Sequence, residues 1–109
     1  RLEALRDLLG QAERRAEALG RSAGSPALQN AASLAVFLLG RVRIGWNESG
    51  LWSPQATSSV HAAEVEAIED VLYHRLRGVQ RAAVLRAGPL GADETRLLGE
   101  FCDTLAMGG

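Results

Sequence analysis

Over the first nineteen residues, apolar side chains recur at alternating spacings of three and four. The repeat consists of Leu2, Leu5, Leu9, Ala12, Ala16 and Leu19. Such spacing is typical of an a/d seam, the single narrow stripe of a helix that packs in a coiled coil or helical bundle. We therefore predict an amphipathic helix that buries this stripe against other helices. Gly20 is expected to terminate it.

A second helix is expected after a short linker of small residues. Ser25 and Pro26 supply an N-cap residue followed by proline in the first helical turn. From residue 27 to about residue 42 the sequence is apolar nearly all round, a pattern typical of a central helix covered on several sides. Residues 45–59 then contain turn formers and both tryptophans of the chain, and they predict one long loop.

The third helix is expected to start near Ser58 or Ser59. The sequence allows one long helix kinked at Gly78 or two helices with a short break, within residues 58–87. Its predicted buried face consists of Val60, Ile68, Val71, Leu72, Leu76, Val79, Ala82, Ala83 and Leu85.

A last helix is expected after the turn at residues 88–91, with Asp93 as its cap. Its predicted buried residues are Leu97, Leu98, Phe101 and Leu105. No segment has the pattern of a strand, so the sequence predicts an all-α fold: a four- or five-helix bundle with one long Trp-containing loop between the second and third helices.

We expect a single domain over residues 1–109, made of the seam helix at 1–20 and a helical core at 26–109. Since the sequence opens at Arg1 and not at methionine, we expect it to be a fragment of a longer chain. The lone Cys102 cannot form an intramolecular disulfide, which favours an intracellular location in a compartment the sequence does not specify. We interpret its thiol as a small buried apolar group and not as a nucleophile.

The charge balance argues against nucleic acid as a partner. Twelve basic residues, all of them arginine, stand against thirteen acidic ones, for a net charge of −1. Arg41 and Arg43, with Trp46 nearby, form a basic and aromatic group, but we interpret the arginines as cations that favour the dipole at a helix C-terminus. The longest apolar stretch, at residues 31–39, is about half of a membrane span, so no span is expected.

The acidic residues of the third helix are the strongest candidates for a metal site. Glu66, Asp70 and His74 are spaced four apart on one helix face. Glu66 and Glu69 also form a Glu-x-x-Glu pair, a pattern that all-α nucleotide pyrophosphatases use for half of a magnesium site. The second half is missing, and the simpler interpretation is a solvated helix face. A small metal-dependent hydrolase is therefore only the alternative, and no cofactor is expected.

The sequence favours a non-enzymatic module for helical protein–protein interaction or oligomerisation. Such a module would act as a scaffold and pack against its partner through a coiled-coil seam. No phosphate-binding glycine loop, zinc motif or nucleophile motif occurs in the sequence. The predicted partner is another protein or a second copy of the chain. The residues expected to contact it are Leu2, Leu5 and Leu9 of the seam, with Trp46 and Trp52.

Overall fold

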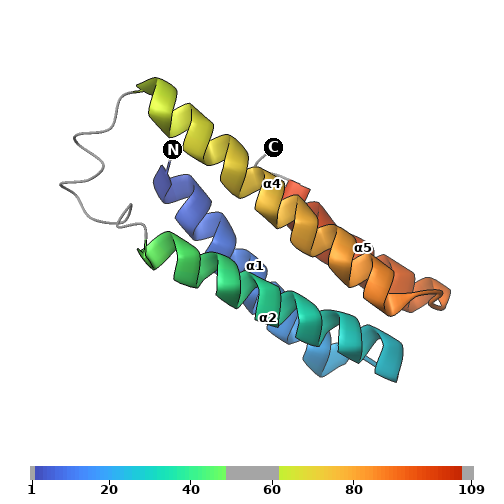
Figure 1. The fold of residues 1–109 in the computed structure, drawn as a ribbon. Coiled ribbons are helices and arrows are strands. Elements are labelled where there is room, and N and C mark those ends of the chain that lie inside the picture. Colours follow the sequence, from blue (N-terminus) through green and yellow to red (C-terminus); the bar gives the residue numbers. More distant parts are fainter. Residues whose placement is uncertain (1, 49–61, 107–109) are drawn as a thin grey trace.

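A computed structural model describes residues 2–48 and 62–106 of the chain. These residues form four helices and no strand: α1 (Leu2–Ser22), α2 (Pro26–Glu48), α4 (Ala62–Ala87) and α5 (Ala92–Ala106) (Figure 1). The prediction of an all-α fold is confirmed. The predicted loop at 45–59 overlaps α2 at residues 45–48, and its remainder, with Trp52, lies outside the described residues.

The helices form an elongated bundle, about 48 Å long and 20 by 17 Å across. Helices that follow one another in the chain run in opposite directions (Figure 1), and α1 closes the ring by packing against α5 as well as α2. With 15 residues, α5 is much shorter than α4, which has 26. Because α5 starts beside the end of α4, it leaves the opposite end of the described bundle with three helices.

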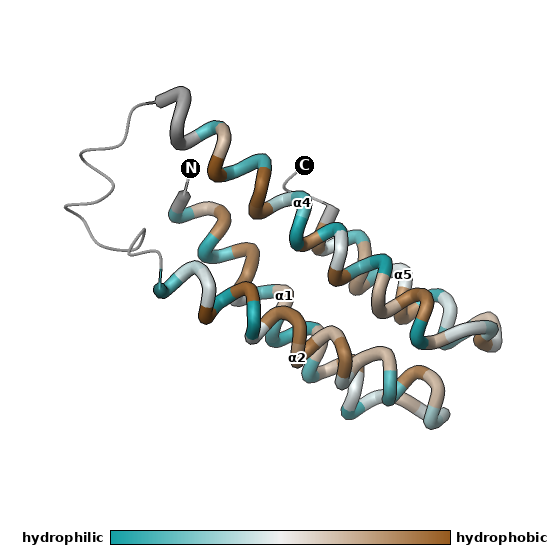
Figure 2. Tube along the Cα trace, in the orientation of Figure 1, coloured by the Kyte–Doolittle hydropathy of each residue, from teal (hydrophilic) through white to brown (hydrophobic). Residues whose placement is uncertain are grey.

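The repeat of α1 is buried along its described length, as the spacing predicts. Its leucines and alanines from residue 5 onward, Leu5, Leu9, Ala12, Ala16 and Leu19, are each at most 6% exposed. Most join one continuous core with the inner faces of the other three helices. Figure 2 shows the same division, with apolar and polar residues alternating around each helix. The narrow stripe is therefore one wall of the bundle interior.

Local hydrogen bonds fix where α2 begins. The backbone N–H of Leu28 donates to Ser25 Oγ over 3.2 Å, which confirms Ser25 as the N-cap residue. The hydroxyl of Ser25 in turn donates to Glu94 Oε2 over 3.0 Å. One side chain thus caps α2 and ties it to the first turn of α5, so the two ends are held side by side.

The turn between α4 and α5 depends on glycine. Gly88 has a φ of 63°, the left-handed conformation that ends many helices and that glycine adopts without steric cost. The prediction of Asp93 as the cap was wrong, because α5 already begins at Ala92. Asp93 lies in the first turn, where its carboxylate favours the positive end of the helix dipole. The prediction that Gly20 ends the first helix was also two residues short, since α1 continues to Ser22.

Helix α2 is longer than the sequence pattern predicts. It continues six residues beyond Val42, through Gly45 and Trp46, to Glu48. The indole of Trp46 is 3% exposed and packs with Leu5 and Leu72 in a second, smaller core at the three-helix end. Burying an aromatic ring stabilises by more than the roughly 1 kcal/mol that a glycine costs within a helix.

Helix α4 is continuous through Gly78, so the alternative of two helices with a break there is excluded. Its buried side chains include Leu72, Leu76, Val79 and Ala83, as predicted. Two residues assigned to the same face were assigned wrongly, because Val71 is 52% exposed and Leu85 is 81% exposed. They lie on the outer side of the helix, which the described residues leave uncovered.

Candidate functional site

The residues that the sequence suggested for partner contact lie inside the bundle wherever their side chains are described. Leu5 and Leu9 are 1% exposed, and Trp46 is 3% exposed. The side chains of Leu2 and Trp52 are outside the described residues. In the folded chain, helices of the same molecule cover the seam of α1 from Leu5 onward. A partner would reach Leu9 only after a neighbouring helix had moved away.

The suggested metal ligands do not come together. Glu66, Asp70 and His74 are all exposed on α4. Among the described residues, no group of three or more His, Cys, Asp or Glu side chains is placed to hold a metal ion. A metal-dependent hydrolase needs ligands that converge on one point, usually from several helices. The geometry of α4 offers no support for that alternative.

Cys102 lies on the inner side of α5 and is 6% exposed. The prediction of a buried apolar residue is confirmed for this thiol. Burial, with a smaller contribution from the charge of Asp103, raises the pKa of Cys102 above its ordinary value. A thiol in this environment stays protonated near neutral pH and is a poor nucleophile.

An ion pair between Arg43 and Glu13 connects α2 to α1. The guanidinium of Arg43 donates to the carboxylate of Glu13 through Nε, at 2.9 Å and 3.0 Å from its two oxygens, and through Nη2 at 2.6 Å. These hydrogen bonds raise the pKa of Arg43 and outweigh the opposing effect of partial burial. The interpretation of Arg43 as a helix C-terminal cation was wrong, because α2 continues to Glu48.

We expect a double-mutant cycle with Glu13→Gln and Arg43→Met to give a coupling of about 1 kcal/mol in the free energy of unfolding. The side chains are 25% and 32% exposed, so solvent weakens the pair only in part. Urea titrations of the four proteins measure the coupling. The exposed pair Arg96 and Glu100, 61% and 58% exposed on α5, is the control and should give about 0.3–0.5 kcal/mol. Equal coupling in both pairs would contradict this account.

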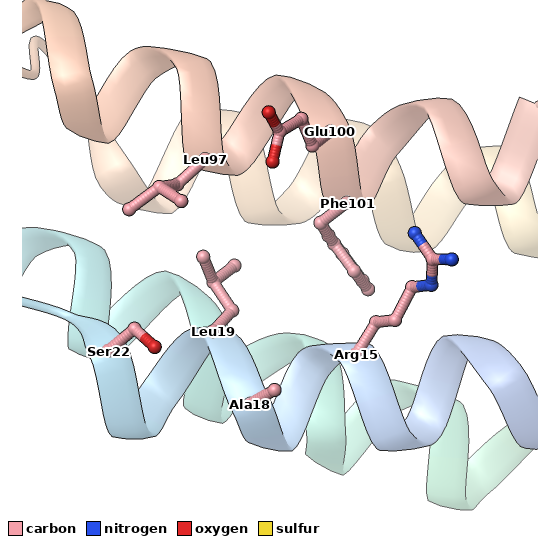
Figure 3. Close-up of a pocket in the computed structure, with 7 residues that line it drawn as sticks. All are labelled: Arg15, Ala18, Leu19, Ser22, Leu97, Glu100 and Phe101. Carbon is pink, nitrogen blue, oxygen red and sulfur yellow. The ribbon is translucent and has the colours of Figure 1, made fainter.

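A small pocket lies between α1 and α5 at one part of their contact (Figure 3). Its volume is about 170 Å³, below the roughly 300–1,000 Å³ typical of small-molecule sites. Leu19, Leu97 and Phe101 give it an apolar lining, and Arg15 and Glu100 stand on opposite sides of it. It contains no histidine, cysteine or paired carboxylates. Neither its size nor its chemistry suggests a reaction centre.

A larger groove runs along the outer side of the bundle between α2 and α4, with a volume of about 680 Å³. Its residues are Leu38, Arg41, Val42, Ile44, Gly45, Glu48, Arg75, Gly78, Val79 and Ala82. A second hollow of about 280 Å³, lined by Trp46, Ile68 and Val71 among others, shares Gly45 and Arg75 with it. The two hollows are therefore adjacent, and we call them together the groove, which is mostly apolar and carries two arginines.

Exposed apolar side chains border this groove. Ile44 and Val71 line it directly and are 50% and 52% exposed. Phe37, 63% exposed, lies one turn from Arg41, and Leu85, 81% exposed, lies about one turn from Ala82. Four of the six large apolar residues that are exposed among the described side chains thus gather on one side of the bundle. We call this surface the α2–α4 face.

The apolar pattern of α2 is the sequence feature that could have indicated this face. A helix that is apolar all round predicts burial on all sides. Among the described residues, however, helix α2 packs closely against two neighbours, α1 and α4, and meets α5 only near its N-terminal end. The apolar residues of its remaining side, Phe37 and Ile44, therefore stay exposed.

Comparison with protein-family models, with curated proteins and with solved structures finds no match to this chain. None of the helices in the described residues is both long and apolar enough to cross a membrane.

Proposed function

We propose that this chain is a non-enzymatic helical interaction module and that its α2–α4 face binds a helix of another protein chain. The observation that carries the proposal is the gathering of Phe37, Ile44, Val71 and Leu85 around one groove. Contiguous apolar surface of this kind is rare on monomeric proteins and commonly marks a binding site. An amphipathic helix is the ligand that best fits an elongated groove between two helices.

The charges beside the groove indicate which probe helix should bind there. Arg41 and Arg75 both line it, and Glu48 lies at one end. The local excess is therefore positive. A synthetic probe helix with an apolar stripe and acidic flanks would match both features, with leucines over Ile44 and Val71 and carboxylates beside the arginines.

A labelled synthetic helix of about 20 residues, with leucine at a and d positions and glutamate at the flanks, is the probe for this proposal. Fluorescence anisotropy at low chain concentration measures its binding. We expect Ile44→Asp to weaken binding at least tenfold, or about 1.4 kcal/mol, because the substitution places a charge in the apolar centre of the groove.

Val84→Asp is the matched control. Val84 is also β-branched, also helical and 47% exposed, close to the 50% of Ile44. It is six residues from Gly78, about 120° around α4 at roughly 100° per residue, and it does not line the groove. Its variant should bind like the original chain. Failure of the original chain to bind, or equal weakening by both substitutions, would contradict the proposal.

A further inference from the structure

The outer side of α2 carries a second heptad repeat, apart from its buried face. It consists of Asn30, Leu34, Phe37, Arg41, Ile44 and Glu48, at spacings of four, three, four, three and four. Leu34 is half-buried and the other five are exposed. We call these six residues the outer seam. Alternating spacings of this kind place side chains on one stripe of a helix, at a and d positions of a coiled coil.

The outer seam is symmetric about Leu39, the residue at the centre of this stretch of α2. Positions 30 and 48, 34 and 44, and 37 and 41 lie at equal distances on either side of it. If two copies of α2 pair antiparallel about this point, each residue of the seam meets its counterpart from the other half. An a position then always faces a d position, as in antiparallel coiled coils.

The side chains brought together by this pairing are complementary. Leu34 packs against Ile44 of the second copy, which joins two apolar groups. Phe37 meets Arg41 of the second copy, and a guanidinium over an aromatic face is a favourable cation–π contact. The amide of Asn30 can donate to the carboxylate of Glu48. No two like charges face each other, and each contact occurs twice because a two-fold interface is self-complementary.

The groove leaves space for such a partner. The α2 helix of the second copy would lie beside both α2 and α4. Gly78 of α4 lines the same groove as Arg41, and nothing lies within 4 Å of where its Cβ would be. At Gly78, α4 therefore has no side chain that would obstruct a helix lying in the groove.

From this complementarity we infer that the occupant of the α2–α4 face is a second copy of this chain, bound antiparallel through the outer seam. The inference rests on the proposed function and names the partner for it. It makes the chain a homodimer with Leu34 and Ile44 as its paired apolar contacts. The pairing also predicts which substitutions can compensate for each other between two copies.

Light scattering across a concentration series should give a mass approaching twice the chain mass of 11.6 kDa. Leu34→Lys alone and Ile44→Glu alone should each weaken dimerisation by about a hundredfold, because the charge enters the interface twice. An equimolar mixture of the two variants should dimerise again. In the mixed dimer, the new lysine faces the new glutamate at one contact, and the original leucine and isoleucine meet at the other.

Circular dichroism melts of each variant show that loss of the dimer is not loss of the fold, and Val84→Glu should dimerise like the original chain. A monomer at every concentration would overturn the inference. So would a dimer that ignores both substitutions, or variants whose mixture stays monomeric. A monomer that still binds the synthetic helix would overturn the homodimer alone, whereas failure of both experiments would remove the proposed function as well.

Discussion

Replacing Leu9 by alanine is expected to lower the free energy of unfolding by about 3 kcal/mol. Leu9 is 1% exposed on α1 and belongs to the main core with residues of the other helices. Its removal leaves a cavity that close-packed neighbours fill only in part. Since a domain of this size has a total stability of about 5–15 kcal/mol, the loss should shift a urea unfolding curve clearly.

Leu85→Ala is the control for that experiment. This substitution makes the same chemical change on α4. Leu85 is 81% exposed, so its truncation removes little buried surface. We expect the free energy of unfolding of the Leu85→Ala variant to stay within about 0.5 kcal/mol of that of the original chain. Similar losses for Leu9 and Leu85 would contradict the assignment of the α1 stripe to the interior. Both measurements belong at low concentration, where the chain is monomeric.

Trp46→Ala is expected to lower the free energy of unfolding by about 3–4 kcal/mol. The residue was assigned to a loop from its sequence, but it lies in α2 and fills the small core with Leu5 and Leu72. Loss of the indole removes most of the apolar contact at the end of the bundle that α5 does not reach. Thermal unfolding followed by circular dichroism measures the effect.

Phe37→Ala provides the comparison on the same helix. Phe37 is 63% exposed, so its loss should change the unfolding of the monomer by much less than the loss of Trp46. If Trp46→Ala were nearly neutral, the indole would have to lie outside the core, and the extension of α2 to Glu48 would lose its physical reason. If Phe37→Ala were the more damaging variant, the division between buried and exposed faces of α2 would be wrong.

The helical fold could be predicted because local signals agree with one another. The spacing of Leu5, Leu9 and Ala12 specifies a helix with one buried stripe, and Ser25 with Pro26 marks the start of the next helix. Gly88 marks the turn before α5 for the same reason, since its conformation is one that other residues adopt only with strain. Each of these features depends only on residues close together in the chain.

The predictions that were wrong concern features that depend on residues far apart in the chain. Gly45 and Trp46 read as loop formers, but both lie in α2, where Trp46 packs with Leu5 and Leu72 from distant parts of the chain. The partner of Arg43 is Glu13, thirty residues away, and no local pattern pairs them.

The largest difference between the predicted and the observed structure is which apolar residues are buried. The narrow stripe of α1 looked like a surface for another chain, yet the bundle buries it. The broad apolar pattern of α2 looked fully buried, yet Phe37 and Ile44 are exposed, because among the described residues α2 packs closely against α1 and α4 and its remaining side is uncovered. Periodicity states which residues share a face, but the number of neighbours around a helix is a property of the whole fold.

Amide NMR of the labelled chain, at a concentration where it is monomeric and titrated with the acidic synthetic helix, tests most directly where a partner binds. We expect the signals that shift to gather at Phe37, Ile44, Val71 and Gly78, with little change around Leu97 and Phe101 in the pocket between α1 and α5. Shifts concentrated in that pocket, or spread through the core as the helices separate, would contradict the assignment of partner binding to the α2–α4 face.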